Sequence, residues 1–428
     1  MLTTVSVSFV SCSPDEVAIP DGKRIYLPAD LRALDLQNDT SQWSFRRMAV
    51  TDNLVIFWQR GFGHDLANAP ALDGQPMTID LPNLERRLEQ FYTYFRDTLD
   101  FKMPESRADS TRMMVMLNYS LDGTAYGGSY DDSIGALWIA PNRVQDAKLN
   151  CIAHELGHSF QCQIGADRPE REWQAYGFYE MASQWMLWQV NPDWLTDENY
   201  HFEAFRTLTH RAFLHIDNIY HSPYVLQYWS DVRGRDVIAR LFREGHNGED
   251  ALMAYKRIFG LSQREMCDEM FEASRHIVGL DFHHAWCETR RYAGSFSTSV
   301  RTSADGWSSP DVACLPENYG FNVIPLDSAN WICPARKLTL YFQGLSGQVP
   351  AAARAHAGWR YGFVAELSDG TYCYSPVGRE PQGRLSYLLP ADVHRAWLVV
   401  MGAPTMHWRT DTGEAASSVT WPYRYKLQ

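Results

Sequence analysis

Short apolar runs and one amphipathic segment alternate through the first third of the chain. Four runs have the length and composition of buried strands, at residues 24–31, 53–58, 112–119 and 136–140. Residues 81–99 instead carry leucine and aromatic side chains at helical spacing, with charged residues at the other positions. This pattern predicts a mixed sheet with a helix packed against it.

The spacing of apolar residues then becomes helical, and later in the chain apolar and polar residues alternate in short runs. From residue 144 to about residue 279 the apolar positions recur at helical spacing, and glycine and proline separate short helices. After residue 293, short alternating runs are separated by Gly, Pro and Asp turns, which is typical of an antiparallel sandwich. We therefore expect an α+β protein. Its predicted divisions are an export segment and linker (1–20), a sheet-and-helix lobe (21–190), a helical lobe (191–294), a linker (295–310) and an antiparallel β-sandwich or jelly-roll domain (311–428).

Composition narrows the class of protein. The 428 residues are 45% hydrophobic, enough for packed interiors, so disorder is not indicated. A net charge of -12 argues against nucleic acid as a partner, because such proteins need a basic face. The eight cysteines form no CxxC pair, so no cysteine-built metal site is predicted. Among Cys314, Cys333 and Cys373 a disulfide is one interpretation; we favour free thiols.

The N-terminal residues suggest export. A short apolar stretch ends at Cys12 and is followed by polar residues, as at the end of a bacterial lipoprotein signal, so Cys12 is a candidate lipid anchor. The basic residues that usually precede such a stretch are missing, so a chance match is the alternative. The prediction is an exported protein, lipid-anchored at the cell surface or in the periplasm, or otherwise extracellular.

The segment HELGH, residues 154–158, carries the candidate chemistry. On a helix, residues four apart differ by about 40° in direction and about 6 Å along the axis, so His154 and His158 can hold one metal ion together. Glu155 points about 100° away, where it can bond a water on that metal. Apolar residues in helical register support a helix here, with Asn142 as its N-cap and Gly165 as its stop.

A third ligand decides the class of site. The extended metzincin motif requires Gly at position 161 and His at position 164, and the chain has Gln161 and Ile164. Residues 177–190 have the pattern of a following helix, and burying Glu180 on this aromatic-rich segment is costly unless it is paired or binds a metal. Three acidic residues of the polar connection rank below Glu180 as ligands: Asp167, Glu170 and Glu172.

HELGHSFQ followed by FYEMASQW resembles the gluzincin zinc metallopeptidases, and its HExGHxxQ form is similar to the enhancin-like, mucin-targeting branch. Segments along most of the chain, including YDDSIGALWIAP and AWLVVMGAPTMHW, resemble a family of exported bacterial HExxH proteins of unknown function. The gluzincin resemblance implies a zincin-like catalytic region, Zn2+ held by His154, His158 and Glu180, and Glu155 as general base. One position departs: thermolysin-like enzymes have Asp four residues after the ligand Glu, and here that residue is Gln184.

The resemblance also implies substrate contacts. An upstream edge strand should pair with the substrate, and Gly135, Ala136 and Leu137 stand in the right order; an ordinary buried strand is the alternative. Gln161 lies near the metal-facing side and is a candidate substrate contact, although surface polarity explains it equally well. The oxyanion donor should be a Tyr or His of the helical lobe, and we choose Tyr224. The candidates are His215, Tyr220, His221, Tyr224 and Tyr228.

These observations favour a zinc-dependent peptidase that hydrolyses peptide bonds of an extracellular protein or glycoprotein, with Glu155 taking a proton from a zinc-bound water. The alternative is a non-catalytic cell-surface protein in which a zincin scaffold and the sandwich bind glycan or protein. A purely structural zinc site is disfavoured, because such sites usually have four protein ligands and are rich in cysteine. The sequence does not indicate an oligomeric state.

Overall fold

A computed structural model describes residues 17, 19–170, 173, 175–327, 336–409 and 419–428. Cys12, Glu172 and Cys333 lie outside the described residues, so the predictions made for them stay predictions. The chain divides into two compact units. Unit 1 comprises Met1–Thr93 and Pro104–Asp167, and unit 2 comprises Tyr94–Met103 and Arg168–Gln428.

Unit 1 is built on the predicted mixed sheet. Its strands follow the order β2-β3-β4-β6-β5, and β1 pairs with β4. β3, β4 and β6 run parallel, whereas β2 and β5 are antiparallel to their neighbours. The strands are β1 (Arg24–Ile25), β2 (Met48–Val50), β3 (Leu54–Trp58), β4 (Thr111–Leu117), β5 (Ala125–Tyr130) and β6 (Ile134–Ile139).

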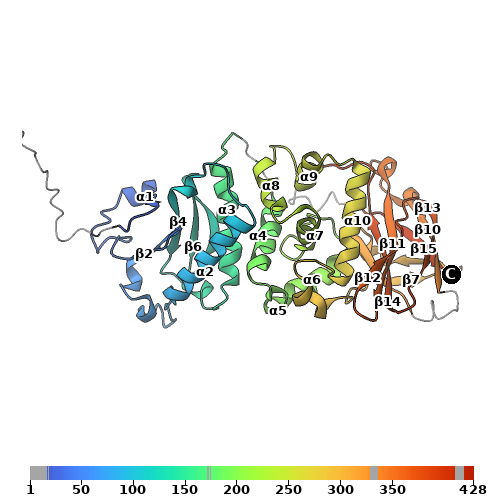
Figure 1. The fold of residues 1–428 in the computed structure, drawn as a ribbon, viewed down its shortest axis with the longest axis horizontal. Helices are drawn as coiled ribbons and strands as arrows, with labels where there is room; N and C mark the ends of the chain where they lie inside the picture. The colour runs from blue at the N-terminus through green and yellow to red at the C-terminus, as the bar shows by residue number, and fades with distance from the viewer. Residues whose placement is uncertain (1–16, 18, 171–172, 174, 328–335, 410–418) are drawn as a thin grey trace, which may run out of the picture. The chain divides into compact units, whose positions relative to one another are not determined.

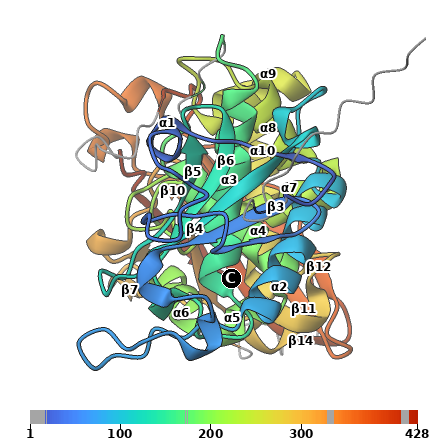
Figure 2. The same ribbon diagram turned by 90° about the vertical axis from the view of Figure 1, so that its left-hand side faces the viewer.

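The helices of unit 1 are α1 (Ala29–Arg32), α2 (Leu81–Thr93) and α3 (Asn150–Ala166). α3 packs on β5 and β6, with α2 beside it, and Figure 2 shows α3 lying along this part of the sheet. The predicted start of α3 is wrong. Pro141–Arg143 forms a separate 3-10 turn, and Leu149, in the left-handed region with φ of 54°, is the residue before the helix. The predicted stop is close, since α3 ends at Ala166.

The helical part of unit 2 matches the helical period of the sequence. Ser262 and Glu265 begin α10 with a reciprocal capping box, in which each side chain bonds the other residue's backbone N–H. The helices are α4 (Gly177–Val190), α5 (Trp194–Asp197), α6 (Asn199–Leu208), α7 (Tyr224–Arg233), α8 (Val237–Glu244), α9 (Ala251–Phe259), α10 (Gln263–Gly279) and α11 (Trp286–Thr289).

In the described part of unit 2, two antiparallel sheets follow the helices. One has the order β13-β10-β15-β8-β7 and the other β12-β11-β14-β9. The strands are β7 (Val300–Thr302), β8 (Ser308–Pro310), β9 (Phe321–Pro325), β10 (Lys337–Gly344), β11 (Trp359–Leu367), β12 (Tyr372–Tyr374), β13 (Gln382–Leu388), β14 (Val393–Gly402) and β15 (Tyr423–Leu427).

The two sheets enclose one core. Leu340 and Phe342 of β10, Phe363 of β11 and Leu398 of β14 meet in a single buried cluster. α10 packs on the other face of the β11–β14 pair, so the layers of unit 2 run from helices through one sheet to the other (Figure 1). The α+β prediction is confirmed, including the antiparallel C-terminal sheets.

The boundaries within the C-terminal half differ from the prediction. Residues 295–310, predicted as a linker, contain the hairpin β7–β8, which pairs with β15 and extends the sandwich. The Ser- and Thr-rich composition reflects an exposed edge of the sheet. The division between the units falls after Asp167, and the helices and sheets of residues 168–428 form one unit. Cys314 and Cys373 are free thiols. Across the described residues, no helix is both long and apolar enough to cross a membrane.

Candidate metal centre

α3 presents two histidines from one face. The Nε2 atoms of His154 and His158 lie 3.1 Å apart, and the rings meet edge to face. Two nitrogens bound to one zinc ion in tetrahedral geometry would lie about 3.3 Å apart, given Zn–N bonds of about 2.0–2.1 Å. The spacing of four residues therefore gives the pair a geometry that suits a shared ion.

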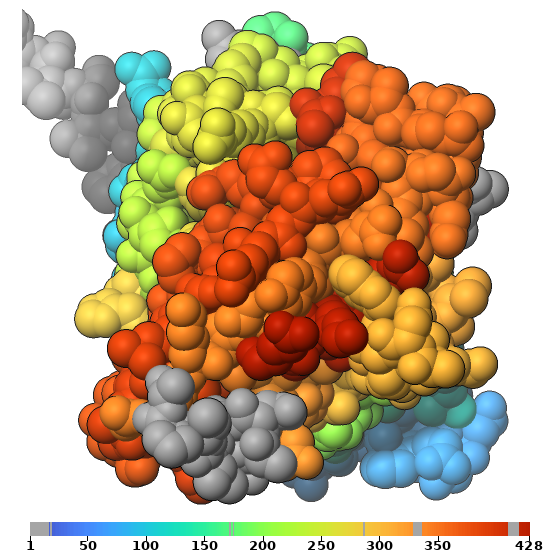
Figure 3. All heavy atoms as spheres, turned by 90° about the vertical axis from the view of Figure 1, so that its right-hand side faces the viewer, coloured from blue at the N-terminus to red at the C-terminus, as the bar shows by residue number. Residues whose placement is uncertain are grey.

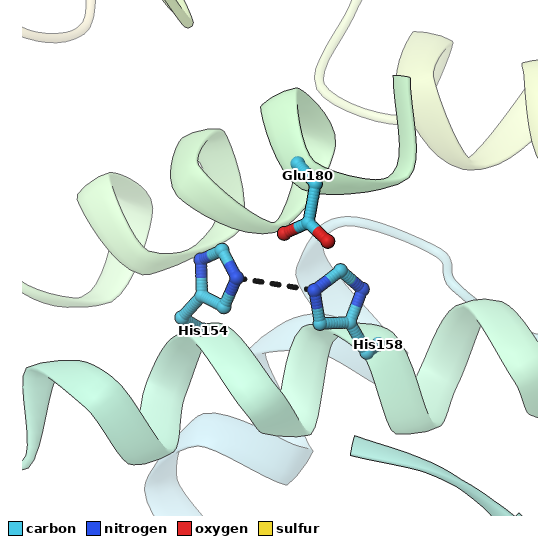
Figure 4. Close-up of side chains that lie close together, drawn as sticks. All are labelled: His154, His158 and Glu180. Carbon is cyan, nitrogen blue, oxygen red and sulfur yellow. Dashed lines mark hydrogen bonds between the residues drawn. The ribbon is translucent and has the colours of Figure 1, made fainter. Parts of the chain in front are cut away.

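Glu180, in the first turn of α4, completes the group. One ligand atom each from His154, His158 and Glu180 lie within 4.8 Å of one another. Figure 4 shows the Glu180 carboxylate directed toward both imidazole rings. Two imidazole nitrogens and a carboxylate oxygen are a donor set that suits Zn2+ and leaves further coordination positions open. These three residues could hold a metal ion.

Gln161 contacts one of the two histidines, His158, from the same helix. Its Oε1 lies 3.0 Å from Nδ1 of His158, and its side chain is buried. An amide oxygen can only accept, so Nδ1 carries the proton and Nε2 keeps its lone pair for a metal. The structure thus places Gln161 as a positioning residue for His158, a role that the sequence analysis did not assign to it.

Glu155 is fixed by the edge strand. Its Oε2 accepts a hydrogen bond of 2.8 Å from the backbone N–H of Gly127 in β5. The strand comes so close to α3 that a Cβ on Gly127 would lie 1.8 Å from the carbonyl oxygen of Glu155. Only glycine permits this approach. The Glu155 carboxylate, next to the histidine pair, is therefore positioned by two elements, its own helix α3 and the strand β5.

The predicted substrate strand is wrong. Gly135, Ala136 and Leu137 belong to β6, which is paired with β4 on one side and β5 on the other. The Gly135 N–H also donates to Gln163 Oε1, and all three residues are buried. Their backbones cannot pair with another chain. The edge strand on this side of the sheet is β5, for which no partner other than β6 is seen among the described residues.

The role predicted for Tyr224, as oxyanion donor, does not agree with its position. It begins α7 as expected, but its side chain is fully buried against Trp188 and Phe205. Burial raises the pKa of Tyr224 well above its ordinary value, and its hydroxyl finds no partner among the described residues. A group without accessible surface cannot donate to a substrate oxygen. The sequence pattern gave the helix start but not the direction of the ring.

Another tyrosine of the same region is accessible. Tyr220 is 43% exposed and lies in the turns before α7. Its carbonyl accepts a 2.9 Å hydrogen bond from Nε2 of Gln184, which is one helical turn beyond Glu180 on α4. Gln184 thus fastens this segment to the ligand helix. The neighbouring His221 lies 2.6 Å from His201, Nδ1 to Nδ1, and burial lowers the pKa of His221.

The remaining candidates are placed as follows. Asp167 accepts bonds from Ser106 and Gln163 at the end of α3, and Glu170 is exposed. His215 and Tyr228 are nearly buried, and Tyr228 packs on His276. The pattern of the sequence did not indicate β5. Its residues, AYGGSY, are rich in Gly and polar side chains, and only the consecutive glycines could have indicated a close backbone approach.

A family model described as "Family of unknown function (DUF6055)" matches residues 17–428, and the chain belongs to this family. No curated protein matches the sequence. The family description contains no activity, metal or substrate, so these rest on the residues themselves.

Proposed function

We propose that this member of the DUF6055 family is a zinc-dependent peptidase of the gluzincin type. The observation that supports it most is the carboxylate of Glu155, held by a backbone hydrogen bond next to a His-His-Glu group. A site that only bound metal would not need this additional, positioned carboxylate. His154, His158 and Glu180 would hold the ion. When bound, zinc would polarise a substrate carbonyl and lower the pKa of a water to near 7.

Glu155 is the general base of this proposal. Its Oε2 is engaged by Gly127, which leaves Oε1 to take a proton from the attacking water and to pass it to the leaving amine. The short bond to a backbone N–H keeps the carboxylate in one orientation, so little reorganisation is needed when the proton moves.

The edge of β5 would hold the substrate. An extended peptide can add to an exposed strand edge through main-chain hydrogen bonds, which suits a protein substrate without a demand for one sequence. β5 packs directly on α3, so a peptide on its outer edge would pass close to Glu155. Tyr126 of β5, 60% exposed, would contact the substrate's side chains.

Tyr220 takes the place of Tyr224 as oxyanion donor in the proposal. It combines an accessible side chain with an anchor to Gln184, one turn from Glu180. Gln184 stands where thermolysin-like enzymes have Asp, and it holds the Tyr220 segment. With the export signal expected at Cys12, the substrate would be an extracellular protein or glycoprotein.

The test uses purified protein and a panel of unfolded peptides and mucin-type glycoproteins, with fragments identified by mass spectrometry. Cleavage should disappear after dialysis against a chelator and return with zinc. Cleavage that survives the chelator would contradict the proposal. Zinc bound without any cleavage across the panel would favour the alternative, a non-catalytic binding protein on the same scaffold.

A further inference from the structure

The outer face of the sheet β13-β10-β15-β8-β7 carries ordered rows of polar side chains. Leu338, Leu340 and Phe342 of β10 point into the core of the sandwich. Successive side chains of a strand alternate between faces, so Tyr341 and Gln343 lie on the opposite, outer face. Figure 3 shows this end of unit 2, where part of the dark-red C-terminal strand is exposed between orange and gold segments.

The central row places an aromatic ring between two cations. Tyr341 is paired with Arg384 of β13 on one side and with Lys426 of β15 on the other. Directly paired residues of antiparallel strands share a face, so all three side chains stand together. The guanidinium of Arg384 lies 5.6 Å from the centre of the Tyr341 ring. Arg384 is exposed and Lys426 is partly exposed.

The neighbouring row repeats this arrangement. Gln343 is paired with Gln382 and with Arg424, and its Oε1 accepts a 2.7 Å hydrogen bond from Nε of Arg424. The guanidinium of Arg424 lies 4.6 Å from the centre of the Trp307 ring. Aromatic rings position Arg384 and Arg424, and an amide also positions Arg424. Rings and amides are uncharged, so they do not neutralise the positive charge of the two guanidinium groups.

Carboxylates neutralise little of this charge. Arg424 lies 3.8 Å from the exposed carboxylate of Asp305, and Lys426 bonds only the backbone oxygen of that residue. Lys337 and Arg384 have no carboxylate partner among the described residues. The whole chain carries a net charge of -12, so this group of cations on one face of the sheet contrasts with an acidic protein.

We propose that this face, defined by Lys337, Tyr341, Arg384, Arg424 and Lys426, binds an extended acidic polysaccharide that carries sulfate or carboxylate groups. Guanidinium and ammonium groups pair with such anions, and Arg does so with two parallel hydrogen bonds. The amides of Gln343 and Gln382 offer donors and acceptors to sugar hydroxyls. Nucleic acid is disfavoured, because its binding rests on many phosphate contacts and this strip has four cations. The proposal goes beyond peptidase activity and does not depend on the metal centre.

Binding of the full-length protein to heparin, measured by calorimetry at physiological salt, tests this proposal, with neutral dextran and duplex DNA as comparison ligands. We expect binding to heparin, none to dextran, and weaker binding to DNA. Exchanging Arg384→Gln together with Lys426→Gln should raise the Kd for heparin about tenfold, the size expected from losing two exposed charge pairs. Both side chains lie at the surface, so the melting temperature should stay unchanged.

A matched control removes two positive charges elsewhere in unit 2, by Arg206→Gln with Arg240→Gln, and should leave the Kd within about twofold, as expected for distant charges screened by salt. Equal weakening by both pairs would overturn the proposal in favour of net charge alone. DNA binding as tight as heparin binding would replace the polysaccharide with nucleic acid, and no heparin binding would remove the site. None of these results bears on peptide cleavage.

Discussion

The two segments that supply the proposed catalytic groups are held in different ways. Glu155 lies inside α3, and its carboxylate is fixed by the backbone of β5 at 2.8 Å. Tyr220 lies in a series of turns that side-chain bonds hold in place, from Gln184 to its carbonyl and between His201 and His221. Regular structure resists local change better than turns held by side chains. We therefore expect α3 and β5 to tolerate changes of pH that weaken the Tyr220 segment.

The largest effect on metal binding is expected at the histidine pair. His158→Ala removes one of the three proposed ligands, the one that Gln161 positions. Zinc affinity should therefore fall by more than about a hundredfold, which exceeds the loss typical when a residue that only contacts a ligand is changed. Metal analysis after dialysis would measure it. His64→Ala, at an exposed histidine of unit 1, should keep its zinc. Equal zinc in both variants would remove the metal centre from the proposal.

Tyr220 and Tyr224 allow the effect of an accessible hydroxyl to be compared with that of a buried one. Tyr220→Phe should lower kcat about a hundredfold, within the range seen when one oxyanion donor is removed. Tyr224→Phe should leave kcat within about twofold, since the hydroxyl of Tyr224 is buried and has no partner among the described residues, so its loss exposes no unsatisfied group. Steady-state kinetics on one peptide decides. A large loss in the Tyr224 variant alone would restore the original prediction and contradict the burial argument.

Gly127 tests whether β5 really positions Glu155. An Ala side chain there would meet the Glu155 carbonyl oxygen, so Gly127→Ala should lower the free energy of unfolding by about 1–3 kcal/mol and reduce kcat/KM. Gly165→Ala on α3 is the matched control, because its Cβ would have no atom of the described residues within 4 Å. It should be neutral or stabilising by up to about 1 kcal/mol. Equal stability of the two variants in denaturant titration would argue against the close approach.

The smallest effect concerns pH. Burial lowers the pKa of His221 against the opposing effect of Asp217, so the folded state favours the neutral ring. The stability this contributes is fully present above the unfolded-state pKa of about 6.5 and is lost as the pH falls below it toward the lower folded-state value. Melting temperatures between pH 5 and pH 8 should show this loss in the wild type and less of it in His221→Gln. Parallel curves would show that His221 does not contribute.

The spacing of apolar residues correctly predicted helices and strands that bury one regular face. α4 begins and ends at the predicted residues, and α2 and β3 lie where their apolar spacing indicated. β5 was not predicted, because Gly127 and Gly128 provide no apolar alternation. Its position depends on contact with α3, which is distant in sequence. Tyr224 failed for a related reason: a helix start is a local property, but the face that is buried depends on Trp188 and Phe205.

The central claim is that Glu155 performs chemistry beside a metal ion and is not part of the ligand set. Glu155→Gln keeps an acceptor oxygen for the Gly127 N–H but cannot take a proton, so zinc content and melting temperature should match the wild type. Cleavage of the same peptide should fall by about a hundredfold to ten-thousandfold, the range for a general base. Cleavage at the wild-type rate, with equal zinc in both proteins, would contradict the account.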